Sequence, residues 1–186
     1  MMSALELFQR FEARSGEWRL CQRANRWGAR RAALAFFGAV SRLGDGVFWY
    51  VLMGLLLLSG TARGAAAALN MALVGIVALM LYRGLKRWTR RPRPFRSHGG
   101  IVAHIAPLDE FSFPSGHTLH AVSFTTVAIA YVPWLAVLLI PFALLVGASR
   151  VVLGLHYPSD VIAATLIGIG LGTVSLRLAA WMLPVV

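Results

Sequence analysis

The chain has 186 residues, of which 58% are hydrophobic and 13% are charged, and its formal net charge is +11. This length leaves room for one domain, and the composition is too apolar for an ordinary soluble domain. Nucleic acid is a poor candidate partner, because the arginines flank apolar segments, where anionic lipid headgroups are the nearer polyanion. Cys21 is the only cysteine, which excludes an intramolecular disulfide and a cysteine-based metal cluster.

The first 42 residues carry eight arginines among leucine, phenylalanine and tryptophan side chains. Four apolar residues of this region fall roughly on one helical face: Leu5, Phe8, Phe11 and Trp18. This pattern is typical of an amphipathic helix that lies on a membrane surface. A secretory signal is a poorer interpretation, because the charge is interleaved with the apolar residues. We therefore predict an interfacial region over residues 1–42 and a transmembrane region over residues 43–186.

Long uncharged runs after residue 42 predict membrane-spanning helices. They cover residues 47–62, 64–82, 118–149 and 161–176. The third run is too long for one span, and Pro133 and Pro141 offer places to break it into two. We therefore expect an all-α, multi-pass transmembrane helical bundle with five spans. A further apolar stretch, residues 32–40, is short for an independent crossing and leaves a sixth, partial span open.

Polar residues interrupt the apolar runs in three segments, residues 86–98, 114–120 and 149–160. The second run ends and the third begins on either side of one extramembrane loop, which contains the first two segments. The predicted fourth span then returns to that side, and the fifth leaves from it. All three polar segments are therefore expected at the same membrane face.

The first polar segment contains Lys86, the only lysine, and Arg93 followed by a proline. Lysine supplies a compact ammonium charge and arginine a forked pair of donors, and a phosphoryl group can use both. Alternatively, these residues belong to an ordinary basic cluster beside the membrane. Arg91 also precedes a proline, so the Arg-Pro pair occurs twice, two positions apart. We interpret the earlier pair as a decoy and Arg93 as the residue of the site.

The second polar segment contains Ser115, Gly116 and His117, and an apolar run begins at Thr118. A serine or glycine in this position favours a helix N-cap, which leaves backbone N–H groups free to bind an anion. His117 at the mouth of that site can donate or accept a proton near neutral pH. The alternative is a simple helix cap with an interfacial histidine.

The third polar segment contains Arg150, His156 and Asp160, in a part of the chain that is otherwise almost free of charge. An ionised group among apolar helices is costly and indicates a function. The carboxylate of Asp160 is close enough in sequence to accept the Nδ1–H of His156 and leave Nε2 as a nucleophile. The alternative is a loop histidine beside an aspartate helix cap. A metal site from His117, His120 and His156 is disfavoured by the many cationic neighbours.

Together the three segments resemble the three-part signature of the type-2 phosphatidic acid phosphatase family, whose superfamily includes bacterial acid phosphatases and vanadium-dependent haloperoxidases. The matching residues are Lys86, Arg93, Pro94, Pro114, Ser115, Gly116, His117, Ser149, Arg150, His156 and Asp160. The resemblance implies a helical bundle that needs no metal or other cofactor and works through a phosphohistidine.

By this resemblance His156 attacks phosphorus and Asp160 orients it, while His117 protonates the departing oxygen and then activates water. The residues implied to bind the phosphoryl oxygens are Lys86, Arg93, Ser115, Gly116 and Arg150.

The expected function is that of an integral-membrane phosphatase acting on a phosphomonoester or diphosphate of a lipid. Phosphatidic acid, phosphatidylglycerol phosphate, undecaprenyl diphosphate and lipid A phosphates all remain candidate substrates. A haloperoxidase is disfavoured because those relatives are typically soluble and larger. The alternative of another class is a transporter or a non-catalytic membrane protein that binds an anion or lipid.

The expected location is the bacterial inner membrane. Five spans place the arginine-rich N-terminus on the same side as the site, and the positive-inside tendency would then put both in the cytoplasm. The family resemblance favours a periplasmic site, and this is our prediction, because the loop arginines are needed for phosphate and are poor indicators of topology. The oligomeric state is left open.

Overall fold

The computed structural model describes residues 5–6, 8, 10 and 15–182. Within these residues the regular elements are all helices, which confirms the predicted all-α class. They are α2 (Glu17–Gly28), α3 (Arg31–Gly44), α4 (Val47–Leu58), α5 (Ala62–Thr89), α6 (Pro94–Ser97), α7 (Gly116–Tyr131), the 3-10 helix η1 (Pro133–Leu135), α8 (Ala136–Val152) and α9 (Pro158–Met182).

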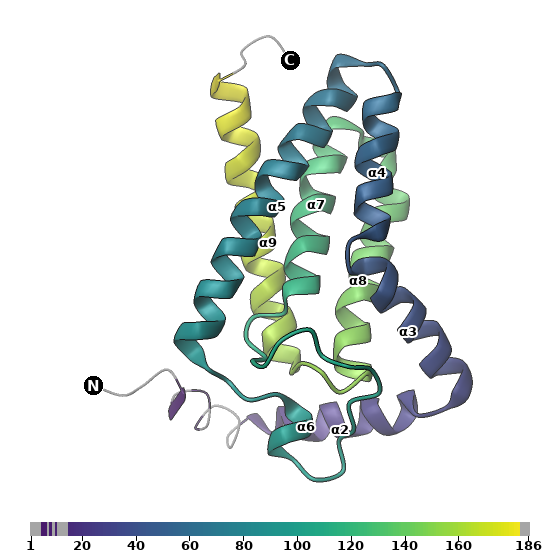
Figure 1. Cartoon of the computed structure of the whole chain (residues 1–186), viewed down its shortest axis with the longest axis vertical. Coiled ribbons are helices and arrows are strands. Elements are labelled where there is room, and N and C mark those ends of the chain that lie inside the picture. The colour runs from purple at the N-terminus through teal and green to yellow at the C-terminus, as the bar shows by residue number, and fades with distance from the viewer. Residues whose placement is uncertain (1–4, 7, 9, 11–14, 183–186) are drawn as a thin grey trace.

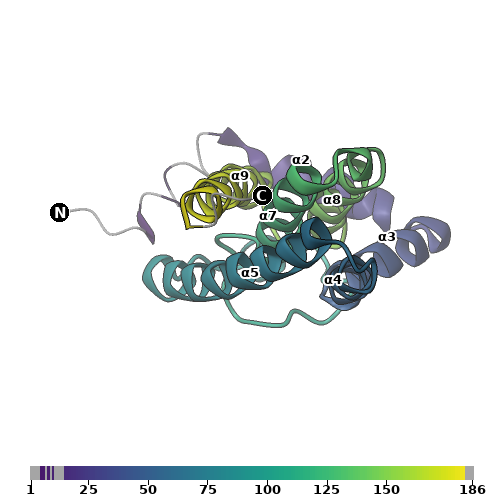
Figure 2. The ribbon, with the colours of Figure 1, turned by 90° about the horizontal axis from the view of Figure 1, so that it is seen from above.

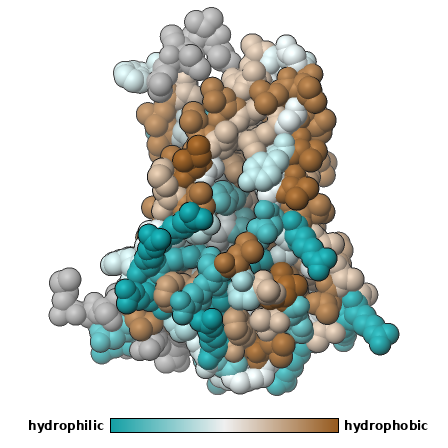
Figure 3. Space-filling model, in the orientation of Figure 1, coloured by the Kyte–Doolittle hydropathy of each residue, from teal (hydrophilic) through white to brown (hydrophobic). Residues whose placement is uncertain are grey.

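Helices α4, α5, α7, α8 and α9 form an upright bundle, and α2 and α6 lie across its lower end (Figure 1). Seen from above, α7 lies among α5, α8 and α9, with which it packs (Figure 2). Apolar side chains cover the upper part of the bundle and hydrophilic side chains gather at its lower end (Figure 3). This division is expected of a bundle whose upper part lies in hydrocarbon.

Small residues allow α9 to pack closely on α7. A Cβ atom added at Gly172 would lie 2.7 Å from Thr126 Cβ, and one added at Gly168 would lie 3.1 Å from the Leu119 carbonyl oxygen. Such spacing of small residues by four is a usual way for membrane helices to bring their backbones together. The close α7–α9 pair fixes the start of both helices at the same end of the bundle.

Three helices are long and apolar enough to cross a membrane: Ala62–Ser97, Pro133–Val152 and Pro158–Trp181. Helices α3 and α4 pass the same test only as a pair, bent by 49°, which gives up to four candidate spans in the described part of the chain. Helix α7, at the centre of the bundle, has 16 residues. The predicted break in the third apolar run does occur at Pro133, whereas Pro141 lies inside α8 and does not end it.

The predicted region boundary at residue 42 falls inside α3, where the helix continues without a break. The N-terminal part of the chain is instead joined to the bundle by packing. Asn25 of α2 donates to the carbonyls of Val102 and Val152 at 2.9 and 3.1 Å, and its Oδ1 accepts the Val102 N–H at 2.9 Å. Gly28 lies against Val152, because a Cβ there would be 2.4 Å from Val152 Cγ1.

The predicted interfacial helix is only partly described, and Phe11 lies outside the described residues. Two residues of its expected lipid face contact protein groups. The ring of Phe8 lies 4.8 Å from that of Phe113, and the ring of Trp18 stacks on His98 at 5.5 Å. An apolar periodicity does not distinguish a lipid-facing surface from a protein-facing one, so the interfacial role stays a prediction.

Candidate active site

The three polar segments meet at the lower end of the bundle, around a cavity of about 550 Å³. Six of the predicted site residues line it: Lys86, Arg93, Gly116, His117, Arg150 and His156. The other two, Ser115 and Asp160, are fully buried. The prediction that all three segments lie at one end is therefore confirmed by the geometry.

His156 lies in the tight turn between α8 and α9. Its backbone N–H donates to the Arg150 carbonyl at 3.1 Å, and Gly154 provides the left-handed backbone, with φ of 77°, that the turn requires. The imidazole Nε2 lies 3.1 Å from Arg93 Nη1 and Nδ1 lies 3.5 Å from Asp160 Oδ2. Because a guanidinium only donates, this contact fits a neutral ring with Nε2 unprotonated.

The protonation state of His156 follows from its surroundings. Burial, and then the charges of Arg93 and Arg150, hold the pKa of His156 well below its ordinary value. The ring is therefore neutral near pH 7, with a lone pair on the nitrogen that faces the cavity. This is the form that a nucleophile requires.

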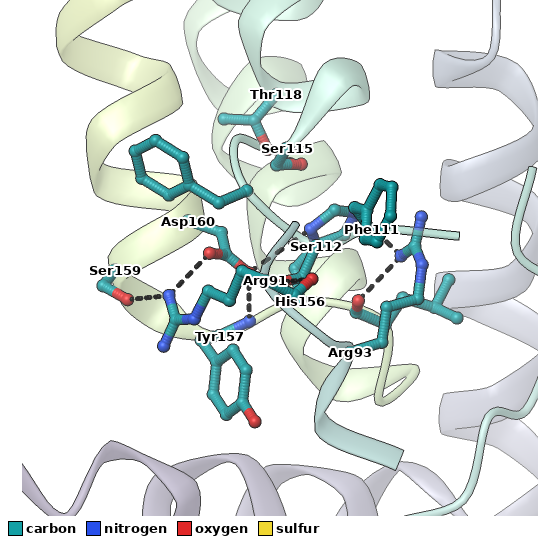
Figure 4. Close-up of polar contacts among 12 residues, drawn as sticks. Arg91, Arg93, Phe111, Ser112, Ser115, Thr118, His156, Tyr157, Ser159 and Asp160 are labelled. Atoms are coloured by element: carbon teal, nitrogen blue, oxygen red, sulfur yellow. Dashed lines mark hydrogen bonds and ion pairs between the residues drawn. The ribbon is translucent and has the colours of Figure 1, made fainter. Parts of the chain in front are cut away.

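Asp160, at the start of α9, contacts Arg91 as well as His156. Its Oδ1 accepts a bond from Arg91 Nη1 at 2.7 Å, and its Oδ2 accepts the Tyr157 N–H at 2.9 Å (Figure 4). Arg91 also donates to Ser159 Oγ at 2.8 Å and pairs with Glu17 of α2. Arg91 does not line the cavity, whereas Arg93 does, which agrees with the interpretation of Arg91 as a decoy; its role as the buried ion-pair partner of Asp160 was not predicted.

Lys86 and Arg93 converge on Asp109, in the loop before α7. Lys86 Nζ lies 2.6 and 2.7 Å from the two carboxylate oxygens, and Arg93 Nη2 lies 2.7 Å from one of them. Burial alone would raise the pKa of Asp109, but Lys86 and Arg93 outweigh it and hold the pKa below its ordinary value. Two cations at the wall of the cavity therefore both bind the Asp109 carboxylate.

His117 and Arg150 both contact residues near the junction of α3 and α4. His117 Nε2 lies 3.2 Å from Asp45 Oδ1, and Arg150 Nη1 donates to Ser41 Oγ at 2.5 Å. Both His117 and His156 line the same cavity.

Ser115 does occupy the predicted N-cap position, since α7 begins at Gly116, but its side chain makes no capping hydrogen bond. The Ser115 N–H, however, donates to the Asp160 carbonyl at 3.3 Å, and its hydroxyl lies 2.9 Å from Thr118 Oγ1. Ser115 therefore joins α7 to α9 behind the cavity. Gly116 faces it, with the Tyr82 ring 3.5 Å from where a Cβ would lie.

The remaining histidines differ in their contacts. His120 Nε2 lies 3.2 Å from the Gly75 carbonyl oxygen and its ring stacks on Phe124, at the edge of the cavity. His104 Nε2 lies 3.3 Å from the Asn25 carbonyl oxygen, outside it. Among the described residues, no group of three or more His, Cys, Asp or Glu side chains is placed to hold a metal ion.

Sequence reasoning missed the acidic partners of the site: Glu17, Asp45 and Asp109. One signal was available, because the whole chain has only seven acidic residues and each is therefore notable. Asp45 also stands between two glycines, which indicates a sharp change of chain direction. Which cation each would meet depends on the fold and could not be read from spacing.

The chain is similar to known phosphatases in sequence. A sequence model of the PAP2 superfamily matches residues 63–182. A lipid A 1-phosphatase of Rhizobium johnstonii is 34% identical over 119 residues, 58% of this chain and 49% of that protein, so the chain spans about half the length of this relative. A decaprenylphosphoryl-5-phosphoribose phosphatase of Mycobacterium tuberculosis is 31% identical over 150 residues, 78% of this chain and 80% of that protein.

The fold is shared with a solved membrane protein. The crystal structure of a transmembrane PAP2-type phosphatidylglycerolphosphate phosphatase from Bacillus subtilis superimposes with a TM-score of 0.73. The two sequences are 24% identical, and the superposition covers 96% of each chain. The likeness includes the N-terminal helices that precede residues 63–182.

Proposed function

The chain belongs to the PAP2 superfamily, and from this premise we propose that it is an integral-membrane lipid phosphate phosphatase. The observation that carries the proposal is that His117 and His156 line one cavity together with Lys86, Arg93 and Arg150. Two imidazoles supply a nucleophile and a proton donor, and three cations supply the charge that a phosphoryl group needs.

In the first step, His156 Nε2 attacks phosphorus, and the bond from phosphorus to the lipid oxygen breaks. The lipid oxygen leaves with a proton from His117, and the phosphoryl group stays on His156. The imidazole gains positive charge in this step, which the nearby Asp160 carboxylate stabilises. Lys86, Arg93 and Arg150 neutralise the nonreacting oxygens, with the backbone of Gly116 at the start of α7. Ser115, also predicted to bind phosphate, instead lies behind the cavity and joins α7 to α9.

In the second step, His117 removes a proton from water as the water oxygen attacks phosphorus. The bond from phosphorus to His156 breaks, inorganic phosphate leaves, and both imidazoles return to their starting forms. No metal takes part in either step. The cationic lining of the cavity supports this, because it favours an anion over a divalent cation.

The substrate class follows from the position of the cavity below the apolar part of the bundle (Figure 3). A phosphomonoester or diphosphate can enter there while its tail stays in hydrocarbon. Phosphatidic acid, phosphatidylglycerol phosphate, undecaprenyl diphosphate and lipid A phosphates are the candidates. The name of the Mycobacterium tuberculosis relative adds a decaprenyl-linked sugar phosphate.

We further propose five spans in a bacterial inner membrane, with the bent α3–α4 pair counted as one and α5, α7, α8 and α9 as the others. This arrangement puts α2 on one side and the end of α9 on the other, as their places in Figure 1 support. The cavity, lined by the loop before α7 and the turn after α8, lies on the side of α2. The cavity faces the periplasm.

The test is phosphate release from a panel of lipid phosphates by the purified protein in detergent with a chelator present. We expect release by the wild type and by His104→Ala, whose imidazole lies outside the cavity. We expect none above background with His156→Ala. Tight binding of the lipids without turnover by the wild type would instead support a transporter or anion-binding protein.

A further inference from the structure

The site contains a second pair of carboxylate and imidazole, at the histidine that handles the leaving group. Asp45 Oδ1 lies 3.2 Å from His117 Nε2. We propose that Asp45 is the positioning residue of His117, holding its imidazole in place and favouring its protonated form for the transfer to the leaving oxygen. This inference rests on the proposed phosphatase function. It concerns a residue outside the part of the chain that the family model matches, residues 63–182.

The chain is built to put Asp45 at this point. Helix α3 ends at Gly44, α4 begins at Val47, and the two axes differ by 49°. Gly46 has φ of 129°, a backbone conformation that residues with a side chain rarely adopt. Gly44 packs against α8, where a Cβ would lie 2.8 Å from Val146 Cγ2. The bend is therefore fixed by glycines on both sides of Asp45.

One turn before Asp45, α3 also contacts Arg150, one of the proposed phosphate-binding residues. The hydroxyl of Ser41, which is buried, accepts a bond from Arg150 Nη1 at 2.5 Å. Asp45, at the C-cap of α3, comes one helical turn after Ser41, and Asp45 lines the cavity. The position of Asp45 relative to His117 is thus coupled to that of Arg150.

The surroundings of His117 disfavour its protonated form. Four cationic or ionisable groups lie near enough to act on it: Lys86 of α5, Arg150 of α8, His156 of the turn after α8 and His120 of α7 itself. A positive charge nearby disfavours the imidazolium form, and an adjacent carboxylate favours it. The side chain of Asp45 is 45% exposed and that of His117 is 11% exposed, so Asp45 stands on the open side of the ring.

In the reaction, Asp45 keeps its contact with His117 Nε2, and Nδ1 of the doubly protonated ring gives its proton to the leaving oxygen as the bond from phosphorus to that oxygen breaks. Asp45 does not touch phosphorus in this step. It keeps the proton on the ring until transfer, and it stabilises the imidazolium that forms when His117 takes a proton from water.

The test is the dependence of the Asp45→Asn effect on the leaving group. The leaving group of a lipid phosphomonoester is an alkoxide, which needs a proton. The leaving group of a nitrophenyl phosphate alkylated on its ring is a stable phenolate, which does not. For the lipid ester we expect the rate of phosphoenzyme formation to fall by about one to two orders of magnitude, with KM nearly unchanged. For the nitrophenyl ester the fall should be less than about threefold.

Three further measurements separate positioning from folding. The alkaline limb of the pH–rate profile with the lipid ester should move to lower pH in Asp45→Asn, because the imidazolium has lost its partner. Asp45→Glu should restore part of the rate. In a His117→Ala background Asp45→Asn should have no further effect, since there is no ring left to position.

Equal losses with both esters and an unmoved alkaline limb would overturn the role of Asp45, and so would an added loss in the His117→Ala background. These outcomes presuppose an active wild type. A wild-type protein that cleaves neither ester would overturn the phosphatase function itself.

Discussion

At the scale of single residues, the nucleophile depends on a buried ion pair. Asp160 is fully buried, and its charge is balanced by Arg91, which is itself 1% exposed and stacks on the Tyr157 ring at 4.0 Å. A buried carboxylate that loses its cation is strongly destabilising. The geometry of His156 therefore depends on a residue that does not line the cavity.

Arg91→Met is expected to lower the free energy of unfolding by about 3–5 kcal/mol, because Asp160 is left buried without its partner. Thermal unfolding in detergent measures this, and phosphate release should fall together with it. Arg90→Met is the matched control, because the side chain of Arg90, the preceding residue, is exposed. Equal stability of the two variants would show that Asp160 does not need Arg91.

Asp109 competes with phosphate for Lys86 and Arg93. Because these two residues lower its pKa, Asp109 stays ionised at neutral pH, and the competition is lost only as pH falls through that lowered pKa. Asp109→Asn should therefore tighten inhibition by inorganic phosphate by about three- to tenfold at pH 7. Weaker inhibition in Asp109→Asn would mean that Asp109 arranges the two cations instead.

The residues that line the cavity could be predicted because three short segments carry fixed spacings that point to phosphate chemistry. Their partners could not, because Asp109 and Asp45 are ordinary loop or helix-end aspartates until the fold brings cations and an imidazole to them. Arg91 and Arg93 look alike in sequence, and only the direction of the chain after α5 sends one to Asp160 and the other to the cavity.

At the scale of elements, the bend between α3 and α4 places Asp45 at the cavity. Gly46→Ala places a Cβ 2.8 Å from the Tyr50 ring at a left-handed φ, which costs about 1–3 kcal/mol. We expect lower activity with the lipid ester and lower thermal stability. Gly54→Ala in α4 meets open space and should leave both unchanged or slightly improved. Similar behaviour of the two variants would show that the bend is not needed.

The helices of the bundle could be predicted from the length of the apolar runs, and the break at Pro133 from proline chemistry. The docking of α2 could not. Its buried face contains Cys21, Asn25 and Gly28, which do not form an apolar stripe, and its arginines resemble those of a lipid-binding helix. Which surface meets protein depends on the carbonyls that Asn25 reaches in distant segments.

At the scale of the whole molecule, the proposed arrangement fixes which loops share a side of the membrane. Helix α6, which contains Arg96, and the connection between α4 and α5, which contains Thr61, lie at opposite ends of the bundle (Figure 1). In a Cys21→Ser background, we expect Arg96→Cys in intact cells to react with a membrane-impermeant maleimide and Thr61→Cys to be protected. The reverse result would place the active site in the cytoplasm, and equal labelling would contradict the five-span arrangement.

The measurement that tests the central claim most directly is trapping of the phosphoryl group on the protein. His117→Ala, given an alkylated nitrophenyl phosphate labelled at phosphorus, should form the intermediate and hydrolyse it slowly, so the label should accumulate on His156. His156→Ala should carry none. Label on another residue, or label that persists in His156→Ala, would contradict the account.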